Sequence, residues 1–416
     1  MNSQQRIIAA MKCQPVDRIP FVPNLNGYAI RHLAPRYHTM ERWRIQQELG
    51  IDCLVRFRIG VRVSPPVIII PPDPSGPTTL LGCSSRQWSK CQPTTDKIKM
   101  RTESKNNRTF VILETPIGSL RCCWRFVETS DMPFPDEPLL KSKNDFAIYH
   151  YVLDHTVVEP AYEEIIETLK AVGDSGTCEA AGGATPIQNL LEYLCDFQNF
   201  YYWLSDYTKE MEDLMQHLME VKRKEYQVLA DSPAPIIITG ENTSTTMMSP
   251  ACMAKYEFPA LNEFSDILHR RGKIHMVHMC GKLNNVLNQL VNCHFDGIHD
   301  AAPSPTGDLD FHVAREKLCA AGKCIAGGID CTAFADLTPV QLEKYIVQRL
   351  EQVAPGTGFL MGSGDTVPAG TTIENLKAVV NALACHGRYP LKKRGSTPIE
   401  LINLSGTSLL NPGDLS

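Results

Sequence analysis

Short apolar runs alternate with helical stretches from residue 236 onward, and this alternation constrains the fold more than any other feature of the chain. Each run is long enough for a buried strand, and each intervening stretch is long enough for a helix. Consecutive strand–helix units predict a parallel sheet, which either closes into a barrel or stays open with helices on both faces. The five runs are Ile236–Thr239, Ile274–Val277, Gly297–Ile298, Cys324–Ala326 and Phe359–Met361.

Two observations favour the barrel. No Gly-x-Gly-x-x-Gly motif follows the first of these strands, which disfavours an open dinucleotide-binding sheet. The array is also long, and 416 residues suffice for one (β/α)8 TIM barrel with insertions. Phe21 and Val22 predict an earlier short strand, and the clearest helix begins at Thr338, with Pro339 and Gln341 completing a capping box. We therefore predict a TIM barrel, in which the chemistry takes place where the strands end.

An insertion is expected in the N-terminal part. Residues 60–108 are rich in Pro, Ser, Thr and Lys, which predicts little regular structure. Two β-rich runs then flank the turn Thr115–Gly118 and predict a β-hairpin. We expect one barrel domain over residues 1–390, with an insertion at about 60–130 and an irregular tail over 391–416.

Composition and charge exclude several classes of protein. The net charge is -5 and the longest basic run is Lys392–Arg394, so no nucleic-acid-binding surface is indicated. No apolar run approaches the roughly 18 residues that a membrane span requires. The N-terminal residues include Arg6 and Lys12 and no apolar signal core, which predicts a cytoplasmic protein. The 15 Cys are scattered, Cys122 and Cys123 are adjacent, and no Cys-x-x-Cys pair occurs, so a disulfide framework is not expected.

Polar side chains follow all five predicted strands. Because the carboxyl ends of barrel strands meet at one mouth, these side chains are expected to converge. Asn and Asp at such positions also cap the following helix, so a capping role stays open for Asn242, Asp330 and Asp365. The residues at the strand ends are, in chain order, Glu241 and Asn242, His278 and Cys280, His299 and Asp300, Asp330, and Asp365.

His278 and Cys280 form the most informative pair among them. Imidazole and thiolate are zinc ligands, and a catalytic zinc site keeps one coordination position open for substrate. We predict that His278 and Cys280 are metal ligands. Glu241, His299 and Asp365 are predicted to complete the site and to act in catalysis. The alternative is that the Cys and the His are packed in the core.

Four blocks of the sequence resemble the uroporphyrinogen decarboxylase superfamily. The resemblance covers about residues 6–60 and 110–390, and it implies a (β/α)8 barrel. The superfamily includes uroporphyrinogen decarboxylases, which use no metal, and corrinoid-dependent methyltransferases. The blocks are Arg6–Ala10 with Pro15–Pro20, Ser249–Pro259 with His278–Gly281, Gly297–Asp308 with Gly327–Asp330, and Gly362–Asp365 with Gly387–Pro390.

The decarboxylase branch fits this chain less well. In that branch an Arg-Gln-Ala-Gly-Arg run follows the N-terminal block, and its arginines neutralise carboxylates of the substrate. The corresponding residues here are Asn24–Arg31, which lack that pair of arginines. A porphyrinogen with many carboxylates would leave charges unmatched in such a site.

The methyltransferase branch has His-x-Cys-Gly where this chain has His278–Gly281. Its members move a methyl group between a small methylated compound, or a thiol, and the cobalt of a corrinoid protein. In thiol-methylating members a further Cys ligand stands where this chain has Ser363, so the chain resembles demethylase-type members more closely. No Asp-x-His-x-x-Gly corrinoid-binding element occurs in the sequence, so the corrinoid would arrive on a partner protein.

The resemblance and the strand-end residues together predict a zinc-assisted methyltransferase. It would move a methyl group from a small O-, N- or S-methyl substrate to a corrinoid carrier protein, with zinc polarising the leaving atom as cobalt attacks the methyl carbon. Three alternatives stay open: decarboxylation of a tetrapyrrole, transfer from methylcorrinoid to a thiol or tetrahydrofolate, and a binding protein without catalysis. The sequence also leaves open the methyl donor, the direction of transfer, and the choice between a monomer and a homodimer.

Overall fold

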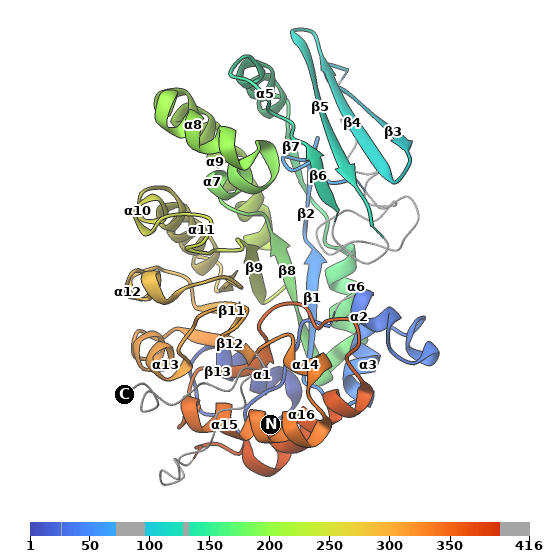
Figure 1. Cartoon of the computed structure of the whole chain (residues 1–416), viewed down its shortest axis with the longest axis vertical. Helices are drawn as coiled ribbons and strands as arrows, with labels where there is room; N and C mark the ends of the chain where they lie inside the picture. The colour runs from blue at the N-terminus through green and yellow to red at the C-terminus, as the bar shows by residue number, and fades with distance from the viewer. Residues whose placement is uncertain (26, 72–95, 128–132, 392–416) are drawn as a thin grey trace, which may run out of the picture.

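A parallel barrel forms the centre of the protein (Figure 1). The computed structural model describes residues 1–25, 27–71, 96–127 and 133–391. Within them, seven strands pair in parallel in the order β1-β8-β9-β10-β11-β12-β13. These strands are β1 (Cys53–Ile59), β8 (Gly176–Gly182), β9 (Ile236–Gly240), β10 (Ile274–His278), β11 (Gly297–Ala301), β12 (Cys324–Ile329) and β13 (Phe359–Ser363).

Residues 20–24 close the barrel between β13 and β1. The backbone N of Val22 donates to the carbonyl of Met361 at 2.8 Å. On the other side, the backbone N of Asp52 donates to the carbonyl of Phe21 at 3.1 Å. This segment, which contains the predicted early strand, takes the place of an eighth strand. The predicted (β/α)8 barrel is confirmed.

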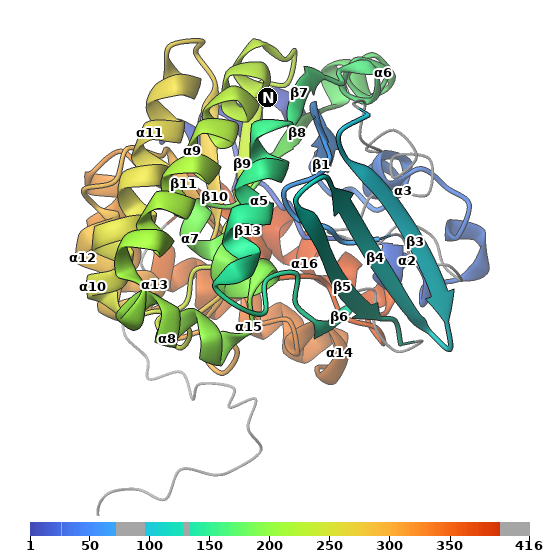
Figure 2. The same ribbon diagram turned by 90° about the horizontal axis from the view of Figure 1, so that it is seen from above.

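Helices alternate with the strands and cover the outside of the barrel (Figures 1 and 2). The predicted helix start is confirmed: Thr338 accepts from the backbone N of Gln341, Gln341 caps in return, and Pro339 is the first helical residue. The helices are α1 (Ser3–Met11), α2 (Gly27–Arg31), α3 (Arg42–Glu48), α5 (Asn144–Asp154), α6 (Glu163–Val172), α7 (Pro186–Asn189), α8 (Phe197–Asp206), α9 (Thr208–Asp231), α10 (Pro250–Cys252), α11 (Phe258–His269), α12 (Leu287–Leu290), α13 (Phe311–Ala320), α14 (Ala333–Asp336), α15 (Pro339–Val353) and α16 (Ile373–His386). Short π-helical turns occur at Leu190–Leu194 and Met253–Glu257.

Apolar side chains fill the base of the barrel. Ile7 and Met11 of α1 are fully buried against them and close this end. A separate and larger apolar cluster lies between the sheet and the outer helices. The barrel residues of the inner cluster alternate along their strands, as expected of side chains that face one side of a sheet. They are Val22, Leu54, Ile236, Ile238, Ile274, Met276, Cys324, Ala326 and Leu360.

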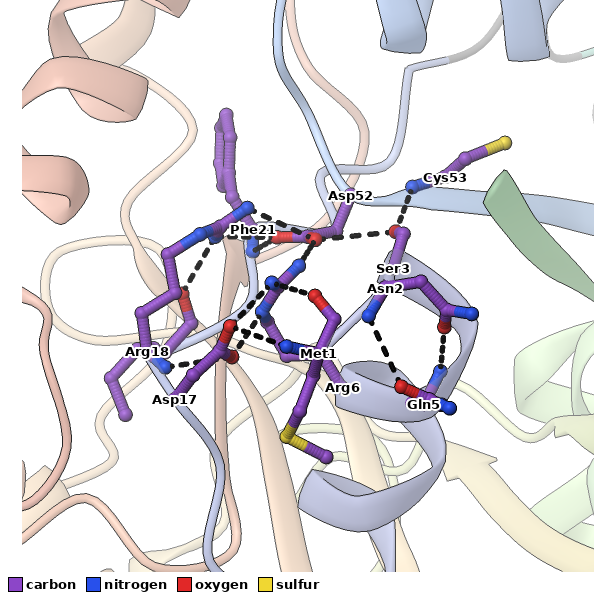
Figure 3. A network of polar contacts seen from close by, with 11 residues as sticks. Met1, Asn2, Ser3, Gln5, Arg6, Asp17, Arg18, Phe21, Asp52 and Cys53 are labelled. Carbon is purple, nitrogen blue, oxygen red and sulfur yellow. Dashed lines mark hydrogen bonds and ion pairs between the residues drawn. The ribbon is translucent and has the colours of Figure 1, made fainter. Parts of the chain in front are cut away.

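Arginine–aspartate pairs tie α1 and the closing segment to the start of β1 (Figure 3). Asp52 is 1% exposed, and its carboxylate accepts from Arg6 Nη1 at 2.6 Å and from Arg18 Nη1 at 2.7 Å. The backbone N of Phe21 donates to the same carboxylate at 3.0 Å. Arg6 Nε donates to Asp17 Oδ1 at 2.6 Å. Each buried charge in this base network therefore has a partner of opposite sign.

The insertion forms an antiparallel sheet beside the barrel, next to α5 (Figure 2). The predicted hairpin is confirmed as two of its strands, which pair across the turn Thr115–Gly118. The prediction of little regular structure over residues 60–108 is wrong in part, because two strands lie in that range. The sheet order is β3 (Lys99–Lys105), β4 (Arg108–Thr115), β5 (Gly118–Arg125) and β6 (Phe134–Glu137), and β2 (Val61–Ser64) pairs separately with β7 (Val157–Pro160).

The charged character of β3 explains why the sequence did not predict this strand. Most of its side chains are exposed, and Arg101 pairs with Glu114 of β4 at 3.0 Å. Cross-strand charge pairs and backbone pairing stabilise such a strand without apolar burial. A strand of this kind has no apolar pattern that the sequence could reveal.

The ends of the expected domain are described only in part. The last described helix, α16, ends at His386, and the predicted limit of the barrel domain at residue 390 stays a prediction. The expected irregular tail, residues 392–416, lies outside the described residues. In the part of the chain that the structure describes, no helix is both long and apolar enough to cross a membrane.

Candidate metal site at the barrel mouth

Three of the predicted residues meet where the barrel strands end. His278 is the last residue of β10 and is 7% exposed, and Cys280 follows it by two residues. Asp365 comes two residues after β13, which is separated from β10 by two strands of the sheet. One ligand atom from each of the three lies within 4.8 Å of the others. The structure thus brings a nitrogen, a sulfur and an oxygen donor together, and we name these three residues the mouth cluster.

A second group of potential ligands shares His278 and lies deeper. It contains His299 and Asp300 of β11, both buried. Arg56 of β1 donates from Nη1 and Nη2 to the two oxygens of Asp300 at 2.9 Å each, and its Nη2 lies 2.8 Å from His299 Nδ1. Its Nε donates to Glu179 Oε1 at 3.0 Å. Because the guanidinium already supplies positive charge here, the mouth cluster is the better place for an added cation. We name Arg56, Glu179, His299 and Asp300 the mouth network.

The mouth network sets the tautomer of His278 but not that of His299. His299 Nδ1 lies 2.8 Å from the donor Arg56 Nη2 and 2.9 Å from the acceptor Asp300 Oδ1, so these contacts are compatible with a ring proton on Nδ1 or on Nε2. That Nε2 lies 3.8 Å from Glu179 Oε2, and neither atom has a hydrogen-bond partner among the described residues. An ionised Asp300 can only accept, and its Oδ2 lies 3.1 Å from His278 Nδ1. The proton of His278 is therefore on Nδ1, and Nε2 is left as the ligand atom.

The charges of the mouth act on both acidic and basic groups. Burial acts to raise the pKa of Asp300, but Arg56 and then His299 hold this pKa well below its usual value. Burial acts to lower the pKa of His278, but the charge of Cys280 and the contact with Asp300 raise this pKa well above its usual value. Without a cation, the cluster therefore retains an extra proton on His278. A metal ion would replace that proton, because a ligating imidazole must be neutral.

Backbone strain occurs at the same rim. Three residues other than glycine have positive φ within the carboxyl half of a barrel strand or just after one: Phe57 at 55°, Asp300 at 57° and Asn242 at 52°. Register shifts accompany the strain in β1 around Phe57 and in β11 around Asp300. Bulges of this kind re-aim the neighbouring side chains, here Arg56 and Asp300. Such backbone conformations cost about 1–3 kcal/mol each and are concentrated at functional sites.

Glu241, a predicted catalytic residue, follows β9 but is not part of the mouth cluster. Its carboxylate is fully buried and accepts from Thr185, from the backbone N at 2.8 Å and from Oγ1. Burial, and then the charge of Glu257, raise the pKa of Glu241 well above its usual value. Burial also raises the pKa of Glu257 to about 7. A catalytic role for Glu241 stays a prediction, and its raised pKa suits a residue that carries a proton.

Two other strand-end residues have structural partners. Asp330 accepts from Thr306 Oγ1 at 2.7 Å and from Thr332 Oγ1 at 2.6 Å, so it orders two loops. Ser363 Oγ accepts from the backbone N of Asn24 at 2.9 Å, so this hydroxyl helps to join the closing segment to β13. Asp330 belongs to no group of three potential His, Cys, Asp or Glu ligands in the described ranges.

Sequence reasoning missed Arg56 and Glu179, and it placed Asp300 at the mouth without giving it a role. Arg56 interrupts the otherwise apolar first half of β1, and a lone charge in a buried strand is a signal because it needs a partner. Asp300 is adjacent to the predicted His299. Glu179 lies on β8, whose small residues Gly, Ala and Cys form no apolar run.

The matched family covers the strands that build the mouth cluster. The uroporphyrinogen decarboxylase (URO-D) family profile matches residues 110–386, more than half of the chain. The chain belongs to the uroporphyrinogen decarboxylase family. The URO-D match includes β9 to β13, whereas the N-terminal resemblance over residues 6–60 lies outside it. None of the curated proteins compared with the sequence matches it.

One similar solved structure supports the barrel fold. A methyltransferase from Methanosarcina mazei is similar over 92% of this chain and 98% of that protein, with a TM-score of 0.58 and 15% identity. At this identity the likeness shows the fold alone. A structure of the pneumococcal virulence factor StrH has a TM-score of 0.32, 12% identity and coverage of 54% of this chain and 62% of that one, which is too distant to support an argument. The same holds for a GH5-4 broad specificity endoglucanase from an uncultured bacterium, with a TM-score of 0.30, 9% identity and coverage of 54% and 76%.

Proposed function

We propose that this protein is a methyltransferase that moves a methyl group from a small O-, N- or S-methyl substrate to a corrinoid on a partner protein. The observation that carries the proposal is the mouth cluster, in which His278, Cys280 and Asp365 meet at the strand ends of a URO-D family barrel. The similar structure from Methanosarcina mazei is named a methyltransferase, which supports methyl transfer as the type of reaction.

The donor atoms of the mouth cluster fit zinc. Imidazole nitrogen, thiolate sulfur and carboxylate oxygen are zinc ligands, and three protein ligands leave a fourth position for substrate. The thiolate of Cys280 and the carboxylate of Asp365 together balance the charge of the ion. Asp300 Oδ2, 3.1 Å from His278 Nδ1, leaves the other ring nitrogen of His278 available to the ion. Bound zinc would supply Lewis-acid polarisation of the atom that holds the methyl group.

The other residues of the mouth orient the ligands and hold protons. Asp300 keeps the proton of His278 on Nδ1 and so presents Nε2 to the cluster. Arg56 holds Asp300 in place and ionised through two hydrogen bonds. Burial raises the pKa of Glu241, and this residue would supply a proton to the leaving oxygen or nitrogen only through intervening groups, because it is fully buried and bonded to Thr185. His299 acts through Arg56 and Asp300 rather than by direct contact with substrate, because it is fully buried.

The third ligand favours a methyl donor over a thiol acceptor. Ser363 stands where thiol-methylating relatives have Cys, and its hydroxyl is engaged with Asn24. Asp365 supplies a carboxylate to the cluster instead. A carboxylate is a harder ligand than a thiolate, and a harder site suits substrates with oxygen or nitrogen at the reacting position. We therefore propose demethylation, with the corrinoid as the methyl acceptor.

Metal analysis combined with a methyl-transfer assay tests the proposal. Purified protein should contain zinc and transfer methyl groups to cob(I)alamin from at least one compound in a panel of methoxylated aromatics, methylamines and methyl thioethers. The variant His278→Ala with Cys280→Ala should lose about one zinc per chain and the transfer activity, since it lacks two of three ligands. Cys385→Ala removes an exposed thiol of α16 and should change neither quantity.

Two outcomes would contradict the proposal. Turnover of uroporphyrinogen by protein without metal at the mouth would favour the decarboxylase alternative. Equal zinc content and equal transfer activity in the double variant and the wild type would show that the mouth cluster holds no catalytic metal.

A further inference from the structure

Two histidines on neighbouring helices face each other outside the barrel. His150 of α5 and His217 of α9 bring their Nδ1 atoms to 2.8 Å, and their rings stack with centroids 5.1 Å apart at 21°. Both side chains are half-buried. α5 follows the inserted sheet in the chain and packs on both that sheet and α9 (Figure 2). The histidine pair therefore lies where the insertion meets the barrel.

A metal ion would replace the proton that the two imidazoles share. A hydrogen bond between two Nδ1 atoms needs one proton and one lone pair, so both rings cannot be protonated there. Two nitrogens at roughly 2.0–2.1 Å from one tetrahedral zinc ion lie about 3.3 Å apart. The observed separation of 2.8 Å therefore needs little adjustment.

Two carboxylates share helix faces with the pair. Asp154 lies four residues after His150, and Asp213 lies four residues before His217, which places each carboxylate beside its histidine. Asp154 Oδ1 is 3.3 Å from His217 Nε2, where it holds the ring proton and leaves Nδ1 for a ligand. The charge of Asp213 acts on His150. In the described residues the four side chains do not form a compact ligand group as they stand, so the exposed side chain of Asp213 must turn inward.

We propose that His150, His217 and Asp213 form a binding site for a divalent transition metal that prefers imidazole, such as zinc, nickel or copper, with Asp154 orienting His217. Facing side chains on packed helices commonly build metal sites. The ion would clamp α5 to α9 and would thereby hold the inserted sheet to the barrel wall. The proposed methyl transfer does not depend on this helix-pair site.

The test uses a variant without the mouth ligands, His278→Gln with Cys280→Ser. The metal-stripped variant is titrated with Zn²⁺ and with Ni²⁺ by calorimetry, and its thermal unfolding is followed with and without each ion. We expect about one ion per chain and a rise in Tm, because an ion that binds the folded state stabilises it. Adding His150→Gln or His217→Gln should weaken binding by more than about 100-fold, since loss of a ligand exceeds the roughly 10- to 100-fold effect of losing an outer-shell partner.

His155→Gln is the matched control on the same helix end. The Nδ1 atom of His155 lies 2.8 Å from the carbonyl of Tyr151 and takes no part in the pair, so this variant should keep the full affinity. Asp154→Asn should weaken binding by about 10- to 100-fold, because it orients a ligand without being one. Absence of binding in the starting variant, or equal affinity after His217→Gln and His155→Gln, would overturn the proposal. Equal numbers of ions bound by the wild type and the starting variant would refute the mouth metal and leave the helix-pair site standing.

Discussion

The two ends of the barrel each hold an arginine–aspartate network. Only in the network at the base does every buried polar side-chain atom have a partner. At the base, Arg6 and Arg18 both donate to Asp52, and no polar side-chain atom of this network is buried without a partner (Figure 3). At the mouth, Arg56 and Asp300 are paired in a similar way. Two buried atoms beside that pair, His299 Nε2 and Glu179 Oε2, nevertheless lack hydrogen-bond partners within the described ranges, and His278 Nδ1 has a 3.1 Å ion-pair contact with Asp300.

The difference fits a structural role at the base and, in our proposal, a functional role at the mouth. A buried polar atom without a partner costs about 1–3 kcal/mol, although such atoms also occur elsewhere in the described residues, for example Gln46 Oε1 and Asn375 Oδ1. In (β/α)8 barrels, residues at the amino ends of the strands serve stability and residues at the carboxyl ends serve chemistry. The same two residue types therefore stabilise the fold at one end of this barrel and, in our proposal, organise a ligand site at the other.

The largest expected effect is loss of the mouth metal. Cys280→Ser should lower zinc affinity by more than about 100-fold, because it removes a direct ligand. It should also abolish methyl transfer while changing Tm little, since Cys280 is only partly buried. Competition with a chromogenic chelator measures the affinity. Cys252→Ser removes a similarly buried thiol outside the cluster, and an equal loss of affinity in that variant would contradict the assignment.

Removal of an arginine at the mouth should lower the free energy of unfolding more than removal of an arginine at the base. Arg56→Met leaves Asp300 and Glu179 buried without a counter-charge, and should cost about 3–5 kcal/mol in the free energy of unfolding. Arg18→Met at the base should cost less, because Asp52 keeps Arg6 and the Arg18 side chain is 28% exposed. Urea unfolding of both variants measures the difference. A larger loss for Arg18→Met would reverse the comparison.

Replacement of one aspartate at each end of the barrel tests two different roles. The aspartate at the mouth should affect zinc affinity, and the aspartate at the base should affect the stability of the fold. Asp300→Asn should weaken zinc binding by about 10- to 100-fold, because the amide no longer holds the His278 proton on Nδ1 as a carboxylate does. Asp52→Asn should lower Tm and leave zinc affinity unchanged, because it contacts only the base network. Zinc titration of both folded variants tests this. Unchanged affinity in Asp300→Asn would show that Asp300 does not orient the ligand.

The smallest expected effects concern the change of folding stability with pH. As the pH rises, a group beside the mouth should lower the stability and a group at the base should raise it. Burial raises the pKa of Glu257, beside the mouth, to about 7, above the value of about 4.3 for an unfolded chain. Its contribution to stability is therefore present below about pH 4.3 and is lost as the pH rises to about 7. At the base, hydrogen bonding to Arg6 lowers the pKa of Asp17, so its contribution is present above about pH 3.9 and is lost as the pH falls further.

Urea midpoints measured across this pH range test both slopes. Glu257→Gln should remove the loss of stability between about pH 4.3 and 7, and Asp17→Asn should reduce the loss at acid pH. The two variants serve as controls for each other, because the groups lie in different parts of the molecule. An unchanged slope in Glu257→Gln would show that its carboxyl does not titrate as described.

Much of the fold could be predicted because buried parallel strands are apolar in sequence. The strands β9 to β13 all appeared as apolar runs, and the capping box of Thr338 appeared as a local motif. β8 was missed because its packing in the sheet depends on small residues. β3 was missed because charge pairs such as Arg101 with Glu114 stabilise it. Both missed strands depend on partners that are distant in the chain.

The candidate site could be predicted in part for a similar reason. His278 and Cys280 are two residues apart, so the sequence predicted that they lie at the same strand end. It also predicted that Asp365 lies at the end of another strand. The sequence did not predict which of the strand-end residues lie in the same cluster. His299 lies in the mouth network, and Glu241 contacts Thr185 instead of the cluster.

The sequence by itself determined the alternation of strands with helices and the polar residues that follow the strands, because both depend on residues close together in the chain. Only the tertiary structure decided which of those residues meet. Residues 20–24 close the barrel beside β13, and irregularities in β1 and β11 accompany the inward turn of Arg56 and Asp300. These contacts depend on which strands pair with one another, and those strands are far apart in the chain. A pattern of neighbouring residues does not indicate which distant strands will pair.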